Sequence, residues 1–232
     1  MTAPGTPPAD GRREWLLVLD TATSQVVVAA GGRDGRPYGA TTWQAGRTHG
    51  ARLLPAIGRL TGEANLRRSR IRGVIVGTGP GAFTGLRVEI ATAKELAHEL
   101  DVPIVGVSTA VALLAASGVG PTGVLLLPAG PNDRTAARAG GSPTLLPGGT
   151  EPELEDRDVL VAVDLDGRAP SDAVSRGALA LKELAWALLR LGAERLAAGD
   201  ADDLARLVPE YVSLPRGVAR DTGEVAWSRD PR

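Results

Sequence analysis

The chain has 232 residues with a net charge of −1, and hydrophobic residues make up 43% of it. This composition is typical of a globular protein with one large domain or two small ones, and the near-neutral charge argues against a protein that grips nucleic acid mainly through its own charge. There is no cysteine and there are only two histidines, His49 and His98, which excludes disulfides, thiolate catalysis, cysteine zinc sites and three-histidine metal sites.

The two ends of the chain differ in composition from the rest. Residues 1–13 are rich in proline and glycine and predict a disordered arm, and residues 216–232 predict a flexible tail. No apolar run approaches the length of a membrane span, and the N-terminus lacks the apolar segment of a signal peptide. We therefore expect a cytoplasmic protein with no membrane partner.

Three strands open the folded part. Residues 15–19 form a continuous apolar run of the kind that is buried on both faces of a sheet. Residues 26–30 and 38–44 follow after polar turns, which predicts an antiparallel meander. The first turn, residues 20–25, carries a carboxylate at the end of a buried strand, as several phosphotransfer folds do to hold a phosphate and its metal. The alternative is that its side chains only satisfy amides of the turn itself.

A helix is predicted over residues 49–64, where one face carries Leu53, Leu54, Ile57, Leu60 and Ala64. The connection that follows, residues 65–72, contains four arginines. Four arginines would suit RNA, but no aromatic residue lies among them to stack on a base. A solvated loop is the simpler interpretation.

The most distinctive stretch is a strand, a glycine-rich turn and a helix in succession. Residues 74–76 are the strand, residues 77–82 are the glycine turn, and Thr84 is the expected N-cap of the helix. The expected buried stripe of this helix is Phe83, Leu86, Ile90, Ala93, Ala97 and Leu100. Glycine suits a backbone at positive φ or in close approach, so valine at Gly79 or Gly81 is predicted to cost stability through strain at positive φ.

The role of the glycine turn stays open at the level of the sequence. Gly77, Gly79 and Ala82 fit the dinucleotide pattern GxGxxG/A. However, the acidic residue that should end the next strand is missing, because Asp101 precedes that strand. A Walker A motif is excluded because no Gly-Lys-Ser/Thr closes the loop. A turn that only aims the helix and a turn that contacts a ligand are equally compatible with these residues.

The rest of the chain predicts a strand over residues 104–107, a helix capped by Ser108, a boundary at residues 118–123 and then a weaker repetition of the first half. The second half is expected to contain strands at 124–127, 134–139, 144–146 and 159–163, a linker or long loop at 147–158, a helix at 176–196 and an extended return at 207–212. We therefore expect an N-terminal lobe over residues 14–117 and a shortened, divergent C-terminal lobe over residues 118–215.

Several strings of the sequence together resemble the TsaB family. They are Leu19-Asp20-Thr21-Ala22-Thr23, Thr48-His49 with Leu53-Leu54-Pro55, Gly106-Val107-Ser108-Thr109, Pro209-Glu210-Tyr211 and, most specific, Gly77-Thr78-Gly79-Pro80-Gly81-Ala82-Phe83-Thr84-Gly85-Leu86-Arg87. The resemblance is dense over residues 16–114 and thin through the second half. It implies an α/β fold of two ribonuclease-H-like lobes, as in the actin, Hsp70 and sugar-kinase superfamily.

The resemblance implies a function in tRNA modification. TsaB is a non-catalytic, degenerate paralogue of the transferase subunit TsaD, and it dimerises with TsaD in the complex that transfers a threonylcarbamoyl group to the adenosine next to the anticodon of tRNA. The implied partners are a TsaD homologue, a TsaE-type ATPase, a second copy of the chain when it is alone, and tRNA only through the complex. No cofactor is expected for the protein alone, and ATP or ADP at the complex interface is left open. The alternative is an active ATPase or kinase of the same superfamily.

The resemblance also assigns site residues, none of them catalytic or metal-binding. Partner contact is expected from Leu54, Ile57, Val88, Ala91 and Glu95, with Glu89, Thr92 and Glu99 on the same outer face of the second helix. The residues that would contact a nucleotide or phosphate are Asp20, Thr21, Thr23, Gly79, Pro80 and Gly81.

Two departures from the family pattern limit this implication. Glu89, Ala91 and Glu95 stand where the family usually has small residues, and residues 128–135 replace its Asp-Ala-Arg-type string. The turn at residues 128–131 offers no carboxylate to face the first turn, whereas phosphotransfer needs amides that cradle the phosphate, an acid that holds the metal and a group that orients the nucleophile. We therefore predict that the isolated protein hydrolyses no ATP.

Overall fold

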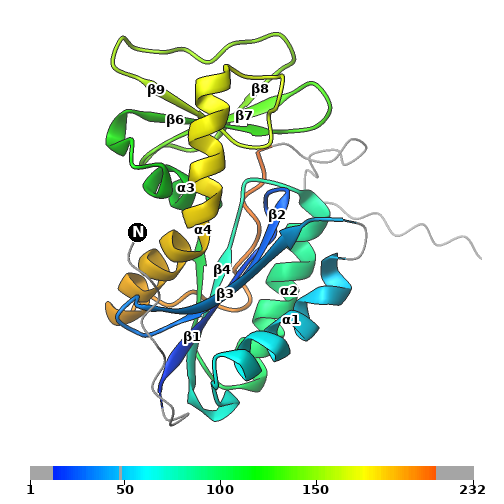
Figure 1. Cartoon of the computed structure of the whole chain (residues 1–232), viewed down its shortest axis with the longest axis vertical. Helices are drawn as coiled ribbons and strands as arrows, with labels where there is room; N and C mark the ends of the chain where they lie inside the picture. The colour runs from blue at the N-terminus through cyan, green and yellow to red at the C-terminus, as the bar shows by residue number, and fades with distance from the viewer. Residues whose placement is uncertain (1–12, 47–48, 213–232) are drawn as a thin grey trace, which may run out of the picture.

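The computed structural model describes residues 13–46 and 49–212 and contains two β-sheets with helices packed on them (Figure 1). The strands are β1 Trp15–Asp20, β2 Gln25–Gly31, β3 Pro37–Gln44, β4 Ile71–Gly77, β5 Ile104–Val107, β6 Gly123–Pro128, β7 Arg134–Arg138, β8 Thr144–Leu146 and β9 Val159–Ala162. The helices are α1 His49–Glu63, α2 Phe83–Glu99, α3 Thr109–Ser117 and α4 Ser171–Ala197, with short 3-10 turns at Arg68–Arg70 and Gly120–Thr122. The predicted α/β class is confirmed. Thr48, the tail, and the arm up to residue 12 lie outside the described residues.

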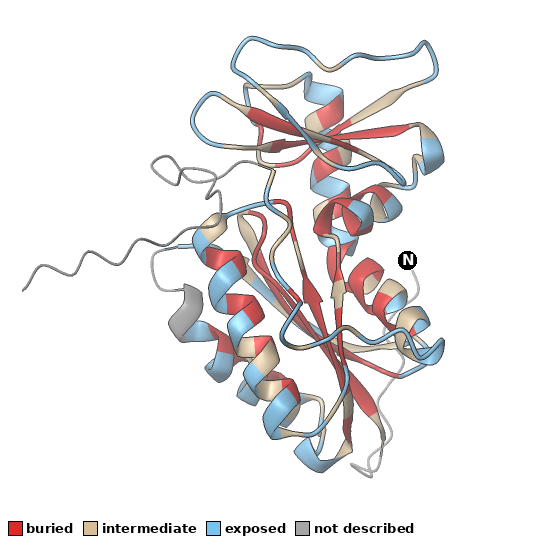
Figure 2. Cartoon of the chain, turned by 180° about the vertical axis from the view of Figure 1, so that it is seen from behind, coloured by how far each residue is buried: buried red, intermediate tan, exposed pale blue. Residues whose placement is uncertain are grey.

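The first sheet has the strand order β3-β2-β1-β4-β5. Its central strand, β1, pairs antiparallel with β2 and parallel with β4, so that Val18 lies between Ala29 and Ile75. All six residues of β1 are buried, as the apolar run predicted. Helices α1 and α2 cover one face of this sheet and α4 covers the other, and the strands between them form the buried layer in Figure 2.

The second sheet, β8-β7-β6-β9, repeats this topology. Strand β6 pairs antiparallel with β7 and parallel with β9, and β7 pairs antiparallel with β8. The long loop predicted at residues 147–158 is confirmed, and it stands where the first lobe has α1. The second lobe is therefore a shortened copy of the first.

Helix α4 joins the two lobes. It packs on β9 and also on all five strands of the first sheet, and its Ala180 and Leu188 belong to one core with residues of both sheets. Gly192 allows the close approach, because a Cβ there would lie 2.5 Å from the Ile75 side chain. The lobe boundary after residue 117 stays a prediction.

Ser108 is the N-cap residue of α3, as predicted, although its hydroxyl makes no cap hydrogen bond. Two other details of the predicted helices were wrong. Helix α2 begins at Phe83 with Ala82 as its N-cap, so Thr84 lies inside the first turn and is not the cap. Leu54 does not share the core face of α1; it is 59% exposed, and Ala56 is buried in its place, because the helix presents residues 53, 56 and 60 to the sheet.

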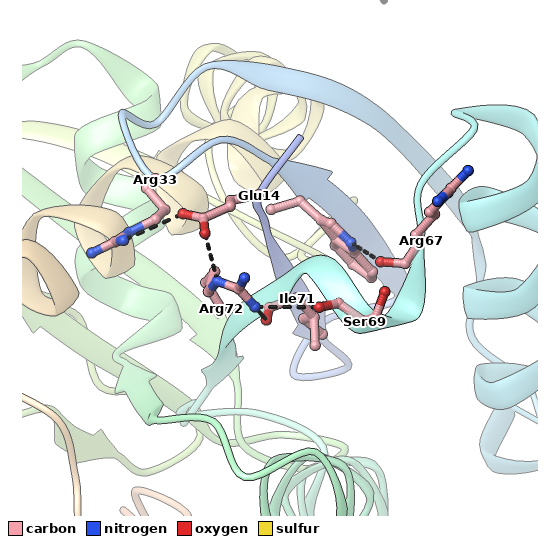
Figure 3. A network of polar contacts seen from close by, with 7 residues as sticks. Glu14, Arg33, Arg67, Ser69, Ile71 and Arg72 are labelled. Atoms are coloured by element: carbon pink, nitrogen blue, oxygen red, sulfur yellow. Dashed lines mark hydrogen bonds and ion pairs between the residues drawn. The ribbon is translucent and has the colours of Figure 1, made fainter. Parts of the chain in front are cut away.

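The arginine-rich connection takes part in local contacts. The Arg72 guanidinium donates to Glu14 at 2.8 Å and to the carbonyl oxygens of Ser69 and Ile71, while Arg33 reaches the other oxygen of Glu14 (Figure 3). The Arg67 carbonyl accepts a hydrogen bond from the Trp15 indole at 2.9 Å. These contacts fasten the connection to the start of β1.

Candidate functional site

Asp20 ends β1, and its carboxylate is fully buried. One oxygen accepts a hydrogen bond from the Ala22 amide at 3.0 Å, and the other accepts one from the Thr109 hydroxyl at 2.6 Å. Burial raises the pKa of Asp20 to about 6, although these two hydrogen bonds act in the opposite direction. Asp20 therefore ties the first turn to the start of α3.

Glu89 is a buried carboxyl, and its predicted place on the outer face of α2 was wrong. It has no exposed surface, and one of its oxygens accepts a hydrogen bond from the Thr21 hydroxyl at 2.5 Å. Burial raises its pKa well above the usual range, and the charge of Asp20 adds to this. The physical reason is spacing: Gly85 and Ala93 are buried one turn away on each side, so Glu89 continues their stripe against the first turn.

The glycine turn packs directly on the first turn. The Ala82 amide donates to the Ala22 carbonyl at 2.9 Å, and a Cβ on Gly81 would overlap that same carbonyl. Gly79 has φ +95°, which confirms the expected positive φ at that position. At Gly81 the expected reason was wrong, because close backbone approach, and not positive φ, excludes a side chain there.

A cleft of about 580 Å³ lies between the two lobes. Of the residues predicted to contact a nucleotide or phosphate, Thr23, Pro80 and Gly81 line it. The cleft lining does not include Asp20, Thr21 or Gly79. Asp20 and Thr21 lie behind the cleft wall, where their side chains are hydrogen-bonded to α3 and α2 respectively. Phosphate contact by these residues stays a prediction.

The turn itself uses some of the residues that could serve a ligand. The Thr23 hydroxyl donates to the Gln25 carbonyl at 3.1 Å and lies 3.2 Å from the Gln25 amide nitrogen. The Ala22 amide is bonded to Asp20. The side chains of Asp20 and Thr23 therefore accept hydrogen bonds from amides of the turn itself, as the alternative interpretation of this turn expected.

Asp164 is a cleft residue that the sequence analysis missed. It follows β9 and reaches across to the first lobe, where it accepts hydrogen bonds from the Ser24 amide at 2.6 Å and from the Ser24 hydroxyl. Its backbone has φ +57°. The turn at residues 128–131 has no carboxylate, as expected, and the second lobe supplies one to the cleft from another loop. The sequence signal was an aspartate just past the end of a predicted strand.

The end of the described chain closes another side of the cleft. The Glu210 amide donates to the Thr78 carbonyl at 2.7 Å, and its carboxylate accepts a hydrogen bond from Ser108 at 3.0 Å. The Tyr211 ring lies 5.2 Å from the ring of Phe83, centroid to centroid. These contacts give the Pro-Glu-Tyr string a structural role beside the glycine turn.

The predicted partner residues lie on α1 and α2, which sit side by side on the outer face of the first sheet (Figure 1). Leu54 is 59% exposed and Val88 is 38% exposed. Ala91 and Glu95 are exposed as well, whereas Ile57 is half-buried against the core. Leu54 and Val88 are thus exposed apolar residues on two neighbouring helices.

Within residues 13–46 and 49–212, no group of three or more histidine, aspartate or glutamate side chains is arranged to hold a metal ion. In the same part of the chain, no helix combines the length and the apolar character needed to cross a membrane.

The sheet order, its repetition in a second lobe and the cleft between the lobes define a two-lobed α/β protein of the actin-like fold. A solved structure, YeaZ from Pseudomonas aeruginosa, superimposes with a TM-score of 0.67 at 26% identity, over 85% of this chain and 99% of that one. The profile of a family described as TsaD, tRNA N6-adenosine threonylcarbamoyltransferase, matches residues 36–143.

Curated relatives match by sequence over shorter stretches. The tRNA threonylcarbamoyladenosine biosynthesis protein TsaB of Haemophilus influenzae is 34% identical over 102 residues, which is 44% of this chain and 42% of that protein. An uncharacterized protein of Mycobacterium leprae is 37% identical over 115 residues, 48% of this chain and 31% of its own length. The chain thus spans less than half the length of these relatives. Together with the structural match, these relatives support the assignment of the chain to the TsaB family.

Proposed function

We propose that this protein is a non-catalytic partner subunit in the synthesis of threonylcarbamoyladenosine on tRNA, and that it binds a TsaD homologue through α1 and α2. The relatives named for this biosynthesis support the proposal. The observation that carries it is the exposure of Leu54 and Val88 on two adjacent helices. Large apolar side chains that gather on one exposed face mark an interaction surface more often than scattered ones do.

The composition of this helix face suits a reversible, non-obligate interaction with a partner. Val88 and Ala91 lie beside the exposed Glu95, and a mixture of apolar and charged residues is typical of a non-obligate interface. The burial of Glu89 also removes one charge from the face. By the same proposal, the protein forms a homodimer through these helices when it is alone, which sedimentation over a concentration series would detect.

The remaining parts of the assembly belong to the same proposal. A TsaE-type ATPase joins the complex, and the protein contacts tRNA only as part of this complex. If ATP or ADP binds, it binds at the interface between subunits. The complex acts in the cytoplasm. The protein alone needs no cofactor.

The observation that favours the alternative function, an active ATPase or kinase, is the cleft between the lobes. Against it stands Asp20, because both carboxylate oxygens already accept hydrogen bonds and the residue has no exposed surface. Steady ATP turnover by the purified protein, abolished in Asp20→Asn, would establish the alternative. We expect no turnover above background.

Measurement of threonylcarbamoyladenosine in tRNA by mass spectrometry tests the proposed function. Cells depleted of the protein should lose the modification, and the wild-type chain should restore it. The double variant Val88→Asp, Ala91→Arg should not. Val111→Asp is the matched control, because Val111 is a similarly exposed valine (41%) on α3, away from the proposed face. Full modification in depleted cells would refute the function, and full rescue by the double variant would refute the surface.

A further inference from the structure

The cleft between the lobes carries negative charge on its walls. Asp164 and Glu210 are the charged residues that line it, and no lysine, arginine or histidine of the described residues does so. Its volume, about 580 Å³, is in the range of small-molecule sites. A nucleotide site in a two-lobed fold would need cations or free amides to offset its phosphates, so this cleft is built for something else.

The first turn has little left to offer an anion. The Ala22 amide donates to the Asp20 carboxylate, and the Ser24 amide and hydroxyl both donate to Asp164. The carboxylate of Asp164 thus occupies the place that a bound anion would take on the turn. Asp164 also holds φ +57°, a backbone conformation that non-glycine residues adopt where the surroundings impose it.

One wall of the cleft is aromatic. Phe83 and Tyr211 both line it, with their ring centroids 5.2 Å apart and their planes inclined by 37°. Tyr211 is 41% exposed and therefore accessible from the cleft side. Aromatic side chains of this kind stack on planar rings, including nucleic-acid bases.

Two features near the same wall would attract a bound anion, but their electrostatic effect is smaller than the repulsion from the two carboxylates. Helix α2 begins at Phe83, and the dipole at a helix N-terminus is equivalent to about half a positive charge. The Arg87 guanidinium lies 5.3 Å from the Phe83 ring but is not part of the lining. Two full negative charges on the lining outweigh them.

We propose that the cleft binds a planar, amine-bearing molecule of nucleoside size that is neutral or cationic, and that Asp164 and Glu210 exclude its phosphorylated forms. The aromatic wall takes the ring, and the carboxylates accept hydrogen bonds from the amine. This inference is independent of the partner role, because the cleft and the α1–α2 face use different residues.

Calorimetric titration of the full chain with adenosine, AMP and ADP tests the proposal, since the three probes share one ring and differ in charge. We expect adenosine to bind about tenfold or more tightly than ADP, with AMP between them. Two results on the wild-type chain would overturn the proposal: ADP binding as tightly as adenosine, or adenosine giving no binding at millimolar concentration.

Variants identify the groups that set the preference. Asp164→Asn combined with Glu210→Gln should bring the adenosine and ADP affinities within about threefold of each other. Tyr211→Leu should weaken the binding of adenosine and of ADP alike, because the two probes share the ring that the aromatic wall takes. Asp166→Asn is the matched control, because Asp166 is exposed two residues away and lies outside the lining. Melting temperatures confirm that each variant is folded. An unchanged preference in the folded double variant would show that the carboxylates do not exclude phosphate.

Discussion

The two lobes have the same order of strands in their sheets, but the apolar cluster that covers the sheet is larger in the first lobe than in the second. In the first lobe α1 connects β3 to β4 and covers a large apolar face together with α2. In the second lobe a loop connects β8 to β9, and the corresponding cluster is small, formed by Leu126, Ala162, Leu165 and Ala173. This sheet topology therefore does not require a covering helix at this position, because a loop held by side-chain contacts replaces it in the second lobe.

The lobes also differ at the ends of equivalent strands. Gly79 follows β4 by two residues and Asp164 follows β9 by two residues, and both have positive φ. In the first lobe glycine leaves room for the backbone of the glycine turn. In the second lobe the residue with positive φ carries a carboxylate that accepts a hydrogen bond from the Ser24 amide. Positive φ after equivalent strands thus accompanies close packing in one lobe and a contact between lobes in the other.

The largest expected effect comes from filling the close contact of the first lobe. Gly81→Val should lower the free energy of unfolding by about 3 kcal/mol or more, because its Cβ overlaps the Ala22 carbonyl and the backbone must move. Urea unfolding measures this. Gly141→Val in the second lobe is the control, since a Cβ there has no neighbour closer than 3.8 Å. Equal losses in the two variants would contradict the contrast between the lobes.

The buried acids of the first lobe should make its stability depend on pH. The folded-state pKa of Asp20 is about 6 against 3.8 for the free group, so the native state binds more protons between these values. Stability should therefore fall as the pH rises from 4 to 6, by roughly 3 kcal/mol for Asp20 alone. Chemical unfolding at several pH values measures the slope.

Glu89→Gln should remove part of this dependence. The amide keeps an acceptor for Thr21 but has no charge to bury, so the variant should be more stable than the parent by about 1–3 kcal/mol at pH 7.5 and nearly equal to it at pH 4.5. Glu95→Gln, exposed on the same helix, is the control. The account of Glu89 fails if the two variants behave alike at both pH values.

A smaller effect is expected where the second lobe fastens its loop. Arg134 is buried and donates to the Thr150 carbonyl at 2.6 Å and to Glu151 at 2.8 Å. Arg134→Ala should cost about 1–3 kcal/mol and speed hydrogen exchange in residues 147–158. Arg157→Ala, which breaks an exposed ion pair with Glu155, should cost about 0.5 kcal/mol or less. Unchanged exchange in Arg134→Ala would show that this arginine does not hold the loop.

Local pattern predicted the strands and helices well, because periodicity and turn residues act over a few positions. The apolar run of β1 and the loop at residues 147–158 are examples. The sequence could not place Glu89 or Asp164, since their partners lie 68 and 140 residues away in the chain. An acidic residue in a helix is normally assigned to the exposed face, and only the tertiary packing against Thr21 reverses that assignment for Glu89.

The partner role of α1 and α2 is tested most directly by the affinity of the purified protein for the TsaD homologue of the same organism. We expect the wild-type chain and Val111→Asp to bind equally, and Val88→Asp to bind at least about tenfold more weakly, a loss of about 1.4 kcal/mol. Melting temperatures of both variants control for folding. Absence of binding by the wild-type chain, or equal binding by Val88→Asp, would contradict a partner role carried by α1 and α2.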